Sequence, residues 1–534
     1  MPILTGIDLL GIQSYIFASN RLRDVLTASW LIEYVMSSEF LTSAGCGQGD
    51  IVNTAGGNAA LVFGDLDTAK TFTRNYTRSL LETAPGLDVA VVHRSFESGH
   101  LASALRVIQA DLARAKLERM PQIPLLGQSV TARCPTTGGP VVDIVDDEFV
   151  SAQIATLRKP AHVHCAQTRW KNFLPDKPLG DNRKATFPVQ LDHLGRSAGD
   201  TSLLGVVHVD GNGIGTLIRQ WIAAKNQAGD DRLRAEYREW SYDLRRLGDN
   251  VIHRLVSRIV SRIQCLESSK RPPRWHLTGA PEALGFDLYL DPTDGMVCLP
   301  FRPIVLGGDD ITFVCDARIA LDLAAEAIRI IENEKIRHLG MLSASVGVAM
   351  VKQHAPFSHA VGLASELCGS AKQTRRASGN SGSWIDWHIG LPKPGEVVSS
   401  IRKRQYRGKT AELTLRPYPL SGHNDVYNFA TLTDSWLGPS PSSHRGGQGF
   451  RGDRLWAESR NRIKQLATLA SSGPSAVEAQ MDAWKTIDPS LTFPSGIDGR
   501  GLVGQRTPLI DIAELIDLHL RLDLDLTVQQ GDPP

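Results

Sequence analysis

Hydrophobic and polar positions follow one another along this chain in two similar series of short strands and helical stripes. The first series opens with TGIDLLGIQSYIF and the second with VHVDGNGIGTLI. Each opening is an apolar strand that ends in an aspartate, followed by a glycine-containing turn and a helical stretch. Aligning Asp8 with Asp210 also aligns Gly11 with Gly213.

The two series stay in step further along the chain. NTAGGNAALVFGD matches VLGGDDITFVCD, which places Gly56-Gly57 over Gly307-Gly308. A third pair, GLDVAVVHRSF and MLSASVGVAMV, is rich in valine and alanine and is typical of strands. Three matches in the same order indicate a repeat of domain size rather than a chance likeness.

The repeated order is strand, helix, strand, turn, strand, helix, strand, which is the pattern of a ferredoxin-like unit. We therefore predict an α+β fold with two ferredoxin-like domains, at residues 1–130 and 201–395. A loop-rich linker subdomain is expected at 131–200, and a mostly helical region at 396–534.

Two amphipathic helices are predicted in the second domain. Asp316 is a suitable N-cap for residues 317–337, and Pro356 opens a helix at 357–372. Their apolar stripes consist of Ile319, Leu323, Ala327 and Ile330 in the first helix, and of Phe357, Val361, Ala364, Cys368 and Ala371 in the second. We expect both helices to cover one side of the sheet and to leave the other side open to a ligand.

Adjacent carboxylates interrupt the apolar run RPIVLGGDDITFVCD. Two unit charges 4 Å apart repel by about 4 kcal/mol in a surface-like dielectric, so Asp309 and Asp310 need either a cation between them or a turn that faces water. Alternation along GVVHVDGNG places Asp210 on the predicted open face, near the same strand ends. Gly307 and Gly308 permit unusual torsions and a close approach to the backbone.

Three converging carboxylates form a ligand set that suits Mg²⁺ or Mn²⁺ together with a triphosphate. Two cations could activate a ribose hydroxyl and stabilise the departing pyrophosphate. We predict Asp210, Asp309 and Asp310 as metal ligands and catalytic residues, with Asp309 the more direct ligand. The loop residues Gly211 and Gly213 are expected beside them, Gly211 as a further metal ligand. Ordinary turn chemistry is the alternative, because Gly-Gly-Asp is also a common turn sequence.

Two further residues of this domain have competing interpretations. Lys372 is placed to meet triphosphate oxygens, or is a solvated lysine at a helix end. His208 is interpreted as a hydrogen-bonded neighbour in preference to a general base.

The first domain keeps Asp8 but has Asn58 and Ala59 where the acidic pair is expected, so a two-metal site looks disabled there. Its turn, with Gly57 and Asn58, either holds an acceptor nucleotide or is a relic of the repeat.

Composition adds few constraints. The 534 residues are 42% apolar and carry 58 Lys and Arg against 57 Asp and Glu, so bulk charge predicts no partner. The N-terminus does not read as a signal peptide, and no apolar run is long enough for a membrane span. Seven scattered cysteines indicate reduced thiols and a cytoplasmic protein. Cys134, His162, His164 and Cys165 offer a zinc site, but ordinary packing is favoured because the spacing fits no strong pattern.

The last part of the chain changes character. Residues 437–453 are rich in Gly, Ser and Pro and are predicted to form a basic loop. Residues 454–470 and 508–524 are predicted to be helices.

Taken together, these motifs resemble the large, palm-containing subunit of type III CRISPR effector complexes. The likeness rests on GIQSYIFASNRLRDVLTASWLIEYV, HVDGNGIG, GGDDITFV and SVGVAMVKQHAPFSHAVGLASELCGSAK, and on the later WIDWHIG and LTLRPYPL. The resemblance implies two palm domains (adenylyl-cyclase/polymerase-like), the second bearing GGDD, and a C-terminal helical domain. It covers most of residues 1–420 in order.

The resemblance also implies an activity and partners. Such a protein converts ATP into cyclic oligoadenylate or a related cyclic nucleotide messenger in antiviral defence, together with guide and target RNA and other type III subunits. By position, Asp210, Asp309 and Asp310 are the implied metal ligands, and Ser343 or Ser345 is implied to touch a base. The HD nuclease domain common in the family is not present before the first palm, and the zinc-knuckle cysteines are reduced to Cys134 and Cys165. Both departures favour a stand-alone cyclase, alone or as a homo-oligomer, or a smaller complex subunit.

Two other functions remain open from the sequence. One is a scaffold subunit that binds RNA and proteins without turnover, against which the intact acidic triad argues. The other is a diguanylate cyclase, although the turn is GGDD followed by isoleucine and not GGDEF or GGEEF.

Overall fold

Two sheets with the same strand order form the framework of this computed structural model, which describes residues 1–118, 131–179, 183–194, 203–225, 229–268, 271–420, 427–438 and 449–522. The first sheet has the order β2-β3-β1-β4 and the second the order β13-β14-β8-β17-β18-β19. The four repeated strands are antiparallel in both sheets. The predicted α+β fold and the repeat of ferredoxin-like strand order are therefore confirmed.

The strands of the two sheets have the following bounds. The first sheet consists of β1 (Ile3–Leu10), β2 (Ile51–Ala55), β3 (Asn58–Phe63) and β4 (Asp88–Ser95). The second consists of β8 (Leu203–Gly211), β13 (Phe301–Leu306), β14 (Ile311–Asp316), β17 (Ala344–Lys352), β18 (Trp384–Ile389) and β19 (Tyr418–Pro419). We call the domain of the first sheet the first palm and the domain of the second sheet the second palm.

Equivalent glycines open the first helix of each palm. Gly11 precedes α1 (Ile12–Ile16) with φ 64°, and Gly213 precedes α8 (Ile214–Ala224) with φ 72°. A left-handed residue at this position is tolerated by glycine at little cost, which explains why both series carry one. The alignment of Asp8 with Asp210 is thus supported by backbone conformation as well as by sequence similarity.

Helices pack on both palms. In the first palm they are α2 (Leu22–Val35), α3 (Ser38–Ser43), α4 (Leu66–Thr83) and α5 (Leu101–Glu118), and in the second they are α9 (Asp230–Val260), α10 (Ala317–Asn333) and α11 (Phe357–Ala377). Asp316 caps α10 as predicted, since its side chain accepts from the backbone N–H of Arg318. Helix α10 ends at Asn333, four residues earlier than predicted, and α11 continues to Ala377.

The expectation that α10 and α11 cover one side of the sheet is wrong. A Cβ on Gly205 of β8 would lie 2.4 Å from the Ala320 Cβ of α10, whereas one on Gly347 of β17 would lie 2.0 Å from the Ala364 carbonyl oxygen of α11. Gly347 pairs with His208, whose side chain points to the face opposite that of Gly205. The two helices therefore cover opposite faces, and the predicted open face lies under α11.

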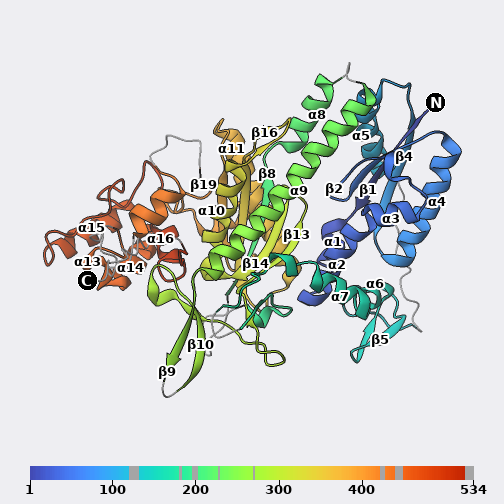
Figure 1. Ribbon diagram of the computed structural model, residues 1–534. Helices are drawn as coiled ribbons and strands as arrows, with labels where there is room; N and C mark the ends of the chain where they lie inside the picture. The colour runs from blue at the N-terminus through green and yellow to red at the C-terminus, as the bar shows by residue number, and fades with distance from the viewer. Residues whose placement is uncertain are drawn as a thin grey trace, which may run out of the picture.

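Helix α9 connects the palms (Figure 1). Its Arg238 and Arg245 donate to the Ile51 and Thr54 carbonyl oxygens of β2 (2.7 and 3.3 Å), and β2 is an edge strand. One turn further on, a Cβ on Gly248 would lie 3.1 Å from the Gly308 carbonyl oxygen. The glycine turns of both palms therefore approach the same stretch of α9.

Smaller elements surround the palms. The linker region holds β5 (Asp143–Val145), β6 (Glu148–Val150), α6 (Ala152–Leu157), α7 (Pro160–Thr168) and β7 (Ala185–Thr186), which pairs with β12 (Val297–Cys298). A hairpin of β9 (Ile263–Ser268) and β10 (Arg271–Leu277) carries β11 (Phe286–Asp287), and β15 (Lys335–Ile336) pairs with β16 (Gly340–Met341). The linker is joined to α2 by the buried ion pair of Arg158 with Asp24 (3.1 Å).

The C-terminal part is less helical than predicted. It contains α12 (Val398–Gln405), α13 (Arg454–Ala457), α14 (Arg460–Ala470), α15 (Pro474–Lys485), α16 (Leu509–Leu515) and a π-helix at Thr431–Leu437. The helix predicted at 508–524 ends at Leu515, and Arg521 then pairs with Ala280 as an isolated β-bridge. Residues 516–518 form a turn after α16, and Leu520 and Leu522 are buried in the non-helical segment that follows. Most of the predicted loop at 437–453 lies outside the described residues.

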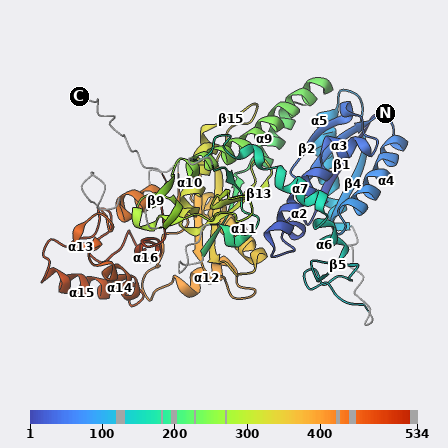
Figure 2. The ribbon, with the colours of Figure 1, turned by 60° about the horizontal axis from the view of Figure 1, so that its bottom comes forward.

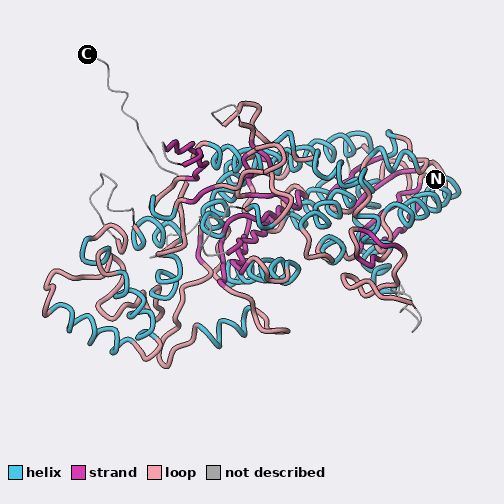
Figure 3. Tube along the Cα trace, turned by 90° about the horizontal axis from the view of Figure 1, so that it is seen from below, coloured by secondary structure: helices cyan, strands magenta, loops and turns pink. Residues whose placement is uncertain are grey.

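The second palm occupies the middle of the molecule, between the first palm and the C-terminal helices (Figures 1 and 2). In the view from below in Figure 3, the first palm and the C-terminal helices again lie at opposite ends. None of the described helices is long and apolar enough to cross a membrane.

The contact between α11 and β17 makes a testable prediction. Gly347→Ala should lower the free energy of unfolding by about 3 kcal/mol, because the added methyl group would overlap the backbone of α11 rather than a flexible side chain. Urea denaturation of the full chain measures this loss.

Gly362→Ala, on α11 itself, is the control for this change on the facing strand β17. A Cβ at Gly362 meets nothing within 4 Å, so this change should stabilise α11 by about 1 kcal/mol through helix propensity. Equal effects of the two substitutions would contradict the close packing of α11 on β17.

Candidate active site

The strand pairing of the second palm brings Asp210 and Asp310 side by side. Asp210 lies at the end of β8, and the pairing of Val209 with Ile311 puts Asp310 directly across from it. His208 and Thr312 are paired across the strands, and their side chains lie on the α11 face. Asp210 and Asp310 are two residues away from them along the strands, so their side chains lie on the same face. The two carboxylates therefore share one face at one end of the sheet.

Asp309 reaches the same place from the tip of the hairpin. Gly307 N–H donates to the Asp310 carbonyl (2.8 Å), which leaves Gly308 and Asp309 as the two turn residues. Gly308 has φ 91° and is buried against Leu244 of α9. A Cβ on Gly211 would lie 2.9 Å from the Asp309 Oδ2 atom, so the missing side chain at 211 is what makes room for this carboxylate.

Burial disfavours the ionisation of two of these carboxylates. Burial, reinforced by the Asp210 carboxylate, raises the pKa of Asp309 to about 6 and the pKa of Asp310 to about 7 from a usual value of 3.8. The Lys372 ammonium opposes this shift at both residues. Perturbed carboxyl groups of this kind are typical of functional sites.

Lys372 holds the site together from α11. Its Nζ atom forms an ion pair with the Asp210 Oδ2 atom at 2.5 Å and donates to the Gly211 carbonyl at 3.0 Å. These contacts exclude a solvated lysine at a helix end, and the predicted contact of Lys372 with triphosphate stays a prediction. Lys372 is the internal counter-charge of Asp210.

Hydrogen bonds set the loop after β8. Ser345 is fully buried and donates to the Asn212 Oδ1 atom (2.9 Å), while Asn212 donates through its side chain to the Ser343 hydroxyl (3.2 Å). The structure thus places Ser345 as a support for the Asp210–Gly213 loop and not on the surface where a base could touch it. Asn212 was missed from the sequence, although it lies inside the DGNG motif.

His208 lies behind the carboxylates. Its Nδ1 atom is 3.0 Å from the Thr312 hydroxyl and 3.5 Å from the Asp310 Oδ1 atom. Burial lowers the pKa of this imidazole. These contacts agree with a hydrogen-bonded neighbour of the site.

The donor set fits a hard divalent cation. Three carboxylates and the Gly211 carbonyl are all oxygen ligands. The Asp310 Oδ1 atom is buried and has no hydrogen-bond partner among the described residues, although the side chain as a whole is half-exposed. A buried carboxylate oxygen without a partner is costly unless a cation can reach it.

Strand register corrects the comparison with the first palm. Asp8 pairs with Asn58 just as Asp210 stands opposite Asp310, so Asn58 is the counterpart of Asp310 and not of Asp309. Gly57 then corresponds to Asp309, whereas the alignment of the two glycine pairs had matched Gly57 with Gly308. The reason is that pairing between strands, rather than the identity of turn residues, fixes which positions are equivalent.

The first palm keeps the lysine but loses the acidic pair. Lys116 of α5 forms an ion pair with Asp8, as Lys372 of α11 does with Asp210. With its amide nitrogen turned toward Asp8, Asn58 donates to both carboxylate oxygens (3.1 and 3.2 Å). A Cβ on Gly57 would lie 2.3 Å from the Ile12 Cδ1 atom, so the glycine there serves packing within the domain.

The sequence did not identify the residues of α9 that support the hairpin. Leu244 and Gly248 lie directly against Gly308 and Leu306. The periodic apolar positions Tyr237, Trp240, Leu244, Leu247 and Val251 were the available signal for this helix, and all five are buried.

A possible group of metal ligands of another kind is formed by His208, Asp210 and Cys368 within the described residues. The cysteines and histidines weighed as a zinc site, at 134, 162, 164 and 165, do not belong to that group. The His162 Nδ1 atom instead lies 2.9 Å from the Thr156 carbonyl oxygen.

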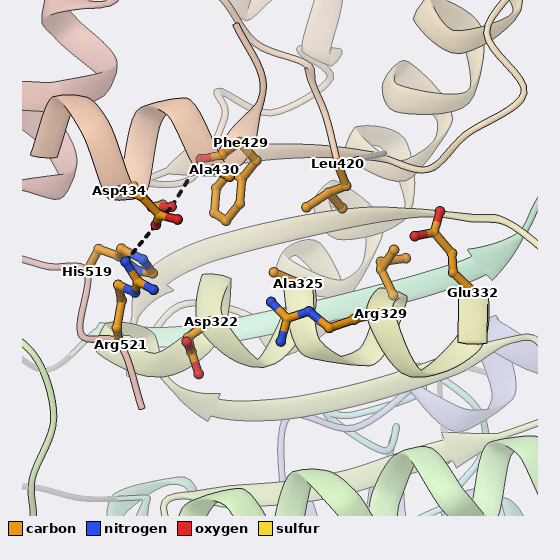
Figure 4. Close-up of a pocket in the computed structure, with 12 residues that line it drawn as sticks. Asp322, Ala325, Arg329, Glu332, Leu420, Phe429, Ala430, Asp434, His519 and Arg521 are labelled. Atoms are coloured by element: carbon orange, nitrogen blue, oxygen red, sulfur yellow. Dashed lines mark hydrogen bonds and ion pairs between the residues drawn. The ribbon is translucent and has the colours of Figure 1, made fainter. Parts of the chain in front are cut away.

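A cavity of about 240 Å³ lies away from these carboxylates, between α10 and the C-terminal part (Figure 4). Its charged walls are already paired: Arg521 with Asp434 at 2.6 Å, and Asp322 with Arg258 at 2.9 Å. It lies beside α10, whereas Asp210 faces α11. Cavity and carboxylate site are therefore separate features.

Comparison with known proteins places this architecture. No protein-family model and no curated protein matches the sequence. Among solved structures, Csm1 of T. onnurineus matches with a TM-score of 0.54 at 15% identity, over 97% of this chain and 70% of that one. This chain has the fold of Csm1.

Complexes of Csm1 show the same likeness. The Csm1–Csm4 cassette with one ATP matches with a TM-score of 0.55 at 13% identity, over 97% of this chain and 70% of that chain. The cassette with cA4 matches with a TM-score of 0.53 at 16% identity, over 97% and 69%. Csm1 is the large palm-containing type III CRISPR subunit, so the predicted structural resemblance is confirmed at the level of the fold.

The raised carboxyl pKa values predict a pH-dependent stability. A group whose pKa is higher in the folded chain favours folding when protonated, so its contribution is present below pH 4 and is lost as the pH rises through 6 to 7. Asp309→Asn with Asp310→Asn should therefore raise the free energy of unfolding at pH 8, on the order of 1 kcal/mol after allowance for solvent screening. Urea denaturation at pH 8 and at pH 4 measures the gain.

The gain should be absent at pH 4, where the carboxyl groups of the natural chain are neutral as well. Asp146→Asn with Asp147→Asn is a matched control, because it removes another adjacent pair from the exposed turn between β5 and β6. A gain at GGDD that persists at pH 4, or that the control reproduces, would contradict the electrostatic account.

Proposed function

We propose that this chain is a metal-dependent nucleotidyltransferase that makes cyclic oligoadenylate, or a related cyclic nucleotide, from ATP. The observation that carries the proposal is the meeting of Asp210, Asp309 and Asp310 at one end of the second-palm sheet. Structures of Csm1–Csm4 in complex with ATP and cA4 support ATP as the substrate, because they share this fold. A role in antiviral defence beside other type III subunits belongs to the same proposal.

Asp210, Asp309 and Asp310 would hold Mg²⁺ or Mn²⁺, with the Gly211 carbonyl as a further oxygen ligand. The bound cation would promote the attack of a ribose 2′- or 3′-hydroxyl on the α-phosphate of ATP and stabilise the departing pyrophosphate. Proton release from Asp309 and Asp310 precedes binding, so we expect cation affinity to rise with pH between 6 and 7.

Lys372 has a role in this proposal that differs from a simple phosphate ligand. In the ligand-free chain it neutralises Asp210. If Asp210 held a cation, Lys372 would be available to bind triphosphate oxygens as a point charge.

The hairpins of both palms contact α9, and this shared neighbour supports a role of the first-palm turn in binding an acceptor nucleotide. We propose that the first palm contributes binding and no chemistry, because Gly57 and Asn58 replace the acidic pair there. Gly57 is packed against Ile12, but Asn58 is exposed. We therefore expect the first palm to contact the acceptor nucleotide through Asn58.

Incubation with labelled ATP and Mn²⁺ or Mg²⁺ tests this function. The natural chain should form cyclic or oligomeric adenylate, and Asp309→Asn with Asp310→Asn should abolish it, because the cation loses two charged ligands. Mass analysis of the product gives ring size, and digestion by linkage-specific nucleases gives linkage.

Asp146→Asn with Asp147→Asn is again the matched control and should retain full synthesis. Product from GTP in place of ATP would favour a diguanylate cyclase. Absence of any product from the natural chain, with and without RNA, would favour a scaffold subunit and reject the enzymatic proposal.

A further inference from the structure

A second kind of ligand set lies behind the carboxylates of the second palm. A ring nitrogen of His208, the Cys368 Sγ atom and an Asp210 carboxylate oxygen all lie within 4.8 Å of one another. His208 and Asp210 are two residues apart on β8 and share its α11 face, while Cys368 faces them from α11. The three atoms therefore come from two elements that pack tightly at Gly347.

The chemistry of these ligands differs from that of the GGDD turn. Magnesium prefers oxygen ligands only, whereas imidazole nitrogen and thiolate sulfur suit zinc and related thiophilic cations. Three protein ligands with a fourth position left to water are a common coordination of zinc in proteins. Metal–ligand bonds of 2.0 to 2.3 Å require a modest contraction of the present spacing.

The surroundings of His208 match those of a metal-binding imidazole. Its Nδ1 atom is 3.0 Å from the Thr312 hydroxyl, and its Nε2 atom has no hydrogen-bond partner within the part of the chain that the structure describes. With Nδ1 protonated and donating to Thr312, Nε2 keeps a lone pair for a cation. Such a second hydrogen bond orients most metal-bound histidines.

A positive charge already occupies this position. Lys372 Nζ contacts Asp210 at 2.5 Å, and the Cys368 thiol donates to the Ser345 carbonyl at 3.2 Å. A divalent cation would take over Asp210 from the lysine, and the thiol proton would pass to solvent as the metal–sulfur bond forms. No oxidant or reductant is needed for this exchange.

We propose that His208, Asp210 and Cys368 form a binding site for a thiophilic divalent cation of the zinc class, and that its occupation inhibits the second palm. Inhibition follows because Asp210 turns toward the imidazole and thiolate and is lost to Asp309 and Asp310. Binding does not depend on the proposed function, whereas the inhibitory consequence rests on it.

Cobalt titration of the metal-free full-length chain tests the binding. Co²⁺ should produce a thiolate-to-metal charge-transfer band in the near ultraviolet, and Zn²⁺ should displace it while excess Mg²⁺ should not. Cys368→Ser should lose the band, and Cys165→Ser, which removes an exposed thiol, should keep it. A band that survives in Cys368→Ser, or that disappears in Cys165→Ser, overturns the site.

His208→Gln provides an independent decision if Cys368→Ser does not fold. It keeps the thiol and removes the nitrogen ligand, so the band should be lost or strongly reduced; an unchanged band overturns the site. In the ATP assay at saturating Mg²⁺, Zn²⁺ should lower synthesis by the natural chain but not the residual or full synthesis of Cys368→Ser. Equal zinc sensitivity of the two chains rejects the inhibitory role, while absence of synthesis in every arm rejects the proposed function and leaves the cobalt result to decide the site.

Discussion

The gathering of three carboxylates at a partly buried end of one sheet is the constraint on which this candidate site depends. Asp210, Asp309 and Asp310 lie at one end of a sheet, where partial burial raises the pKa of two of them toward neutrality. Lys372 offsets part of that cost from the helix that covers the same face. Like charges this close together are tolerated where a cation or another positive group can bind between them.

Glycines make this arrangement sterically possible. The absence of a side chain at Gly211 admits Asp309, and the absence of one at Gly248 lets α9 support the hairpin that carries Gly308. Gly347 lets α11 approach the sheet closely enough for Lys372 to reach Asp210. Position, and not residue type alone, therefore turns three ordinary aspartates into a possible metal site.

Comparison of the two palms shows which part of the site belongs to the fold and which to the chemistry. Both palms retain an aspartate at the end of the central strand and a lysine that pairs with it from the following helix. Of the two palms, the second has carboxylates at the hairpin and the first has Gly57 and Asn58 at the equivalent positions. The aspartate–lysine pair is thus common to both palms, and under the proposed function the hairpin decides which of them binds a cation.

The sequence by itself determined the repeat, the α+β class, the aspartate at the end of each central strand and the acidic hairpin, because strand periodicity and turn glycines are local properties of the chain. Tertiary structure decided the rest. The placement of α11 opposite α10, the partnership of Lys372 with Asp210 and the burial of Ser345 all depend on which helix packs on which face. The equivalence of Asn58 with Asp310 depends on strand register. The glycine pair is offset by one position between the two hairpins, so the sequence alignment misses this equivalence, whereas the hydrogen bonding between strands defines it.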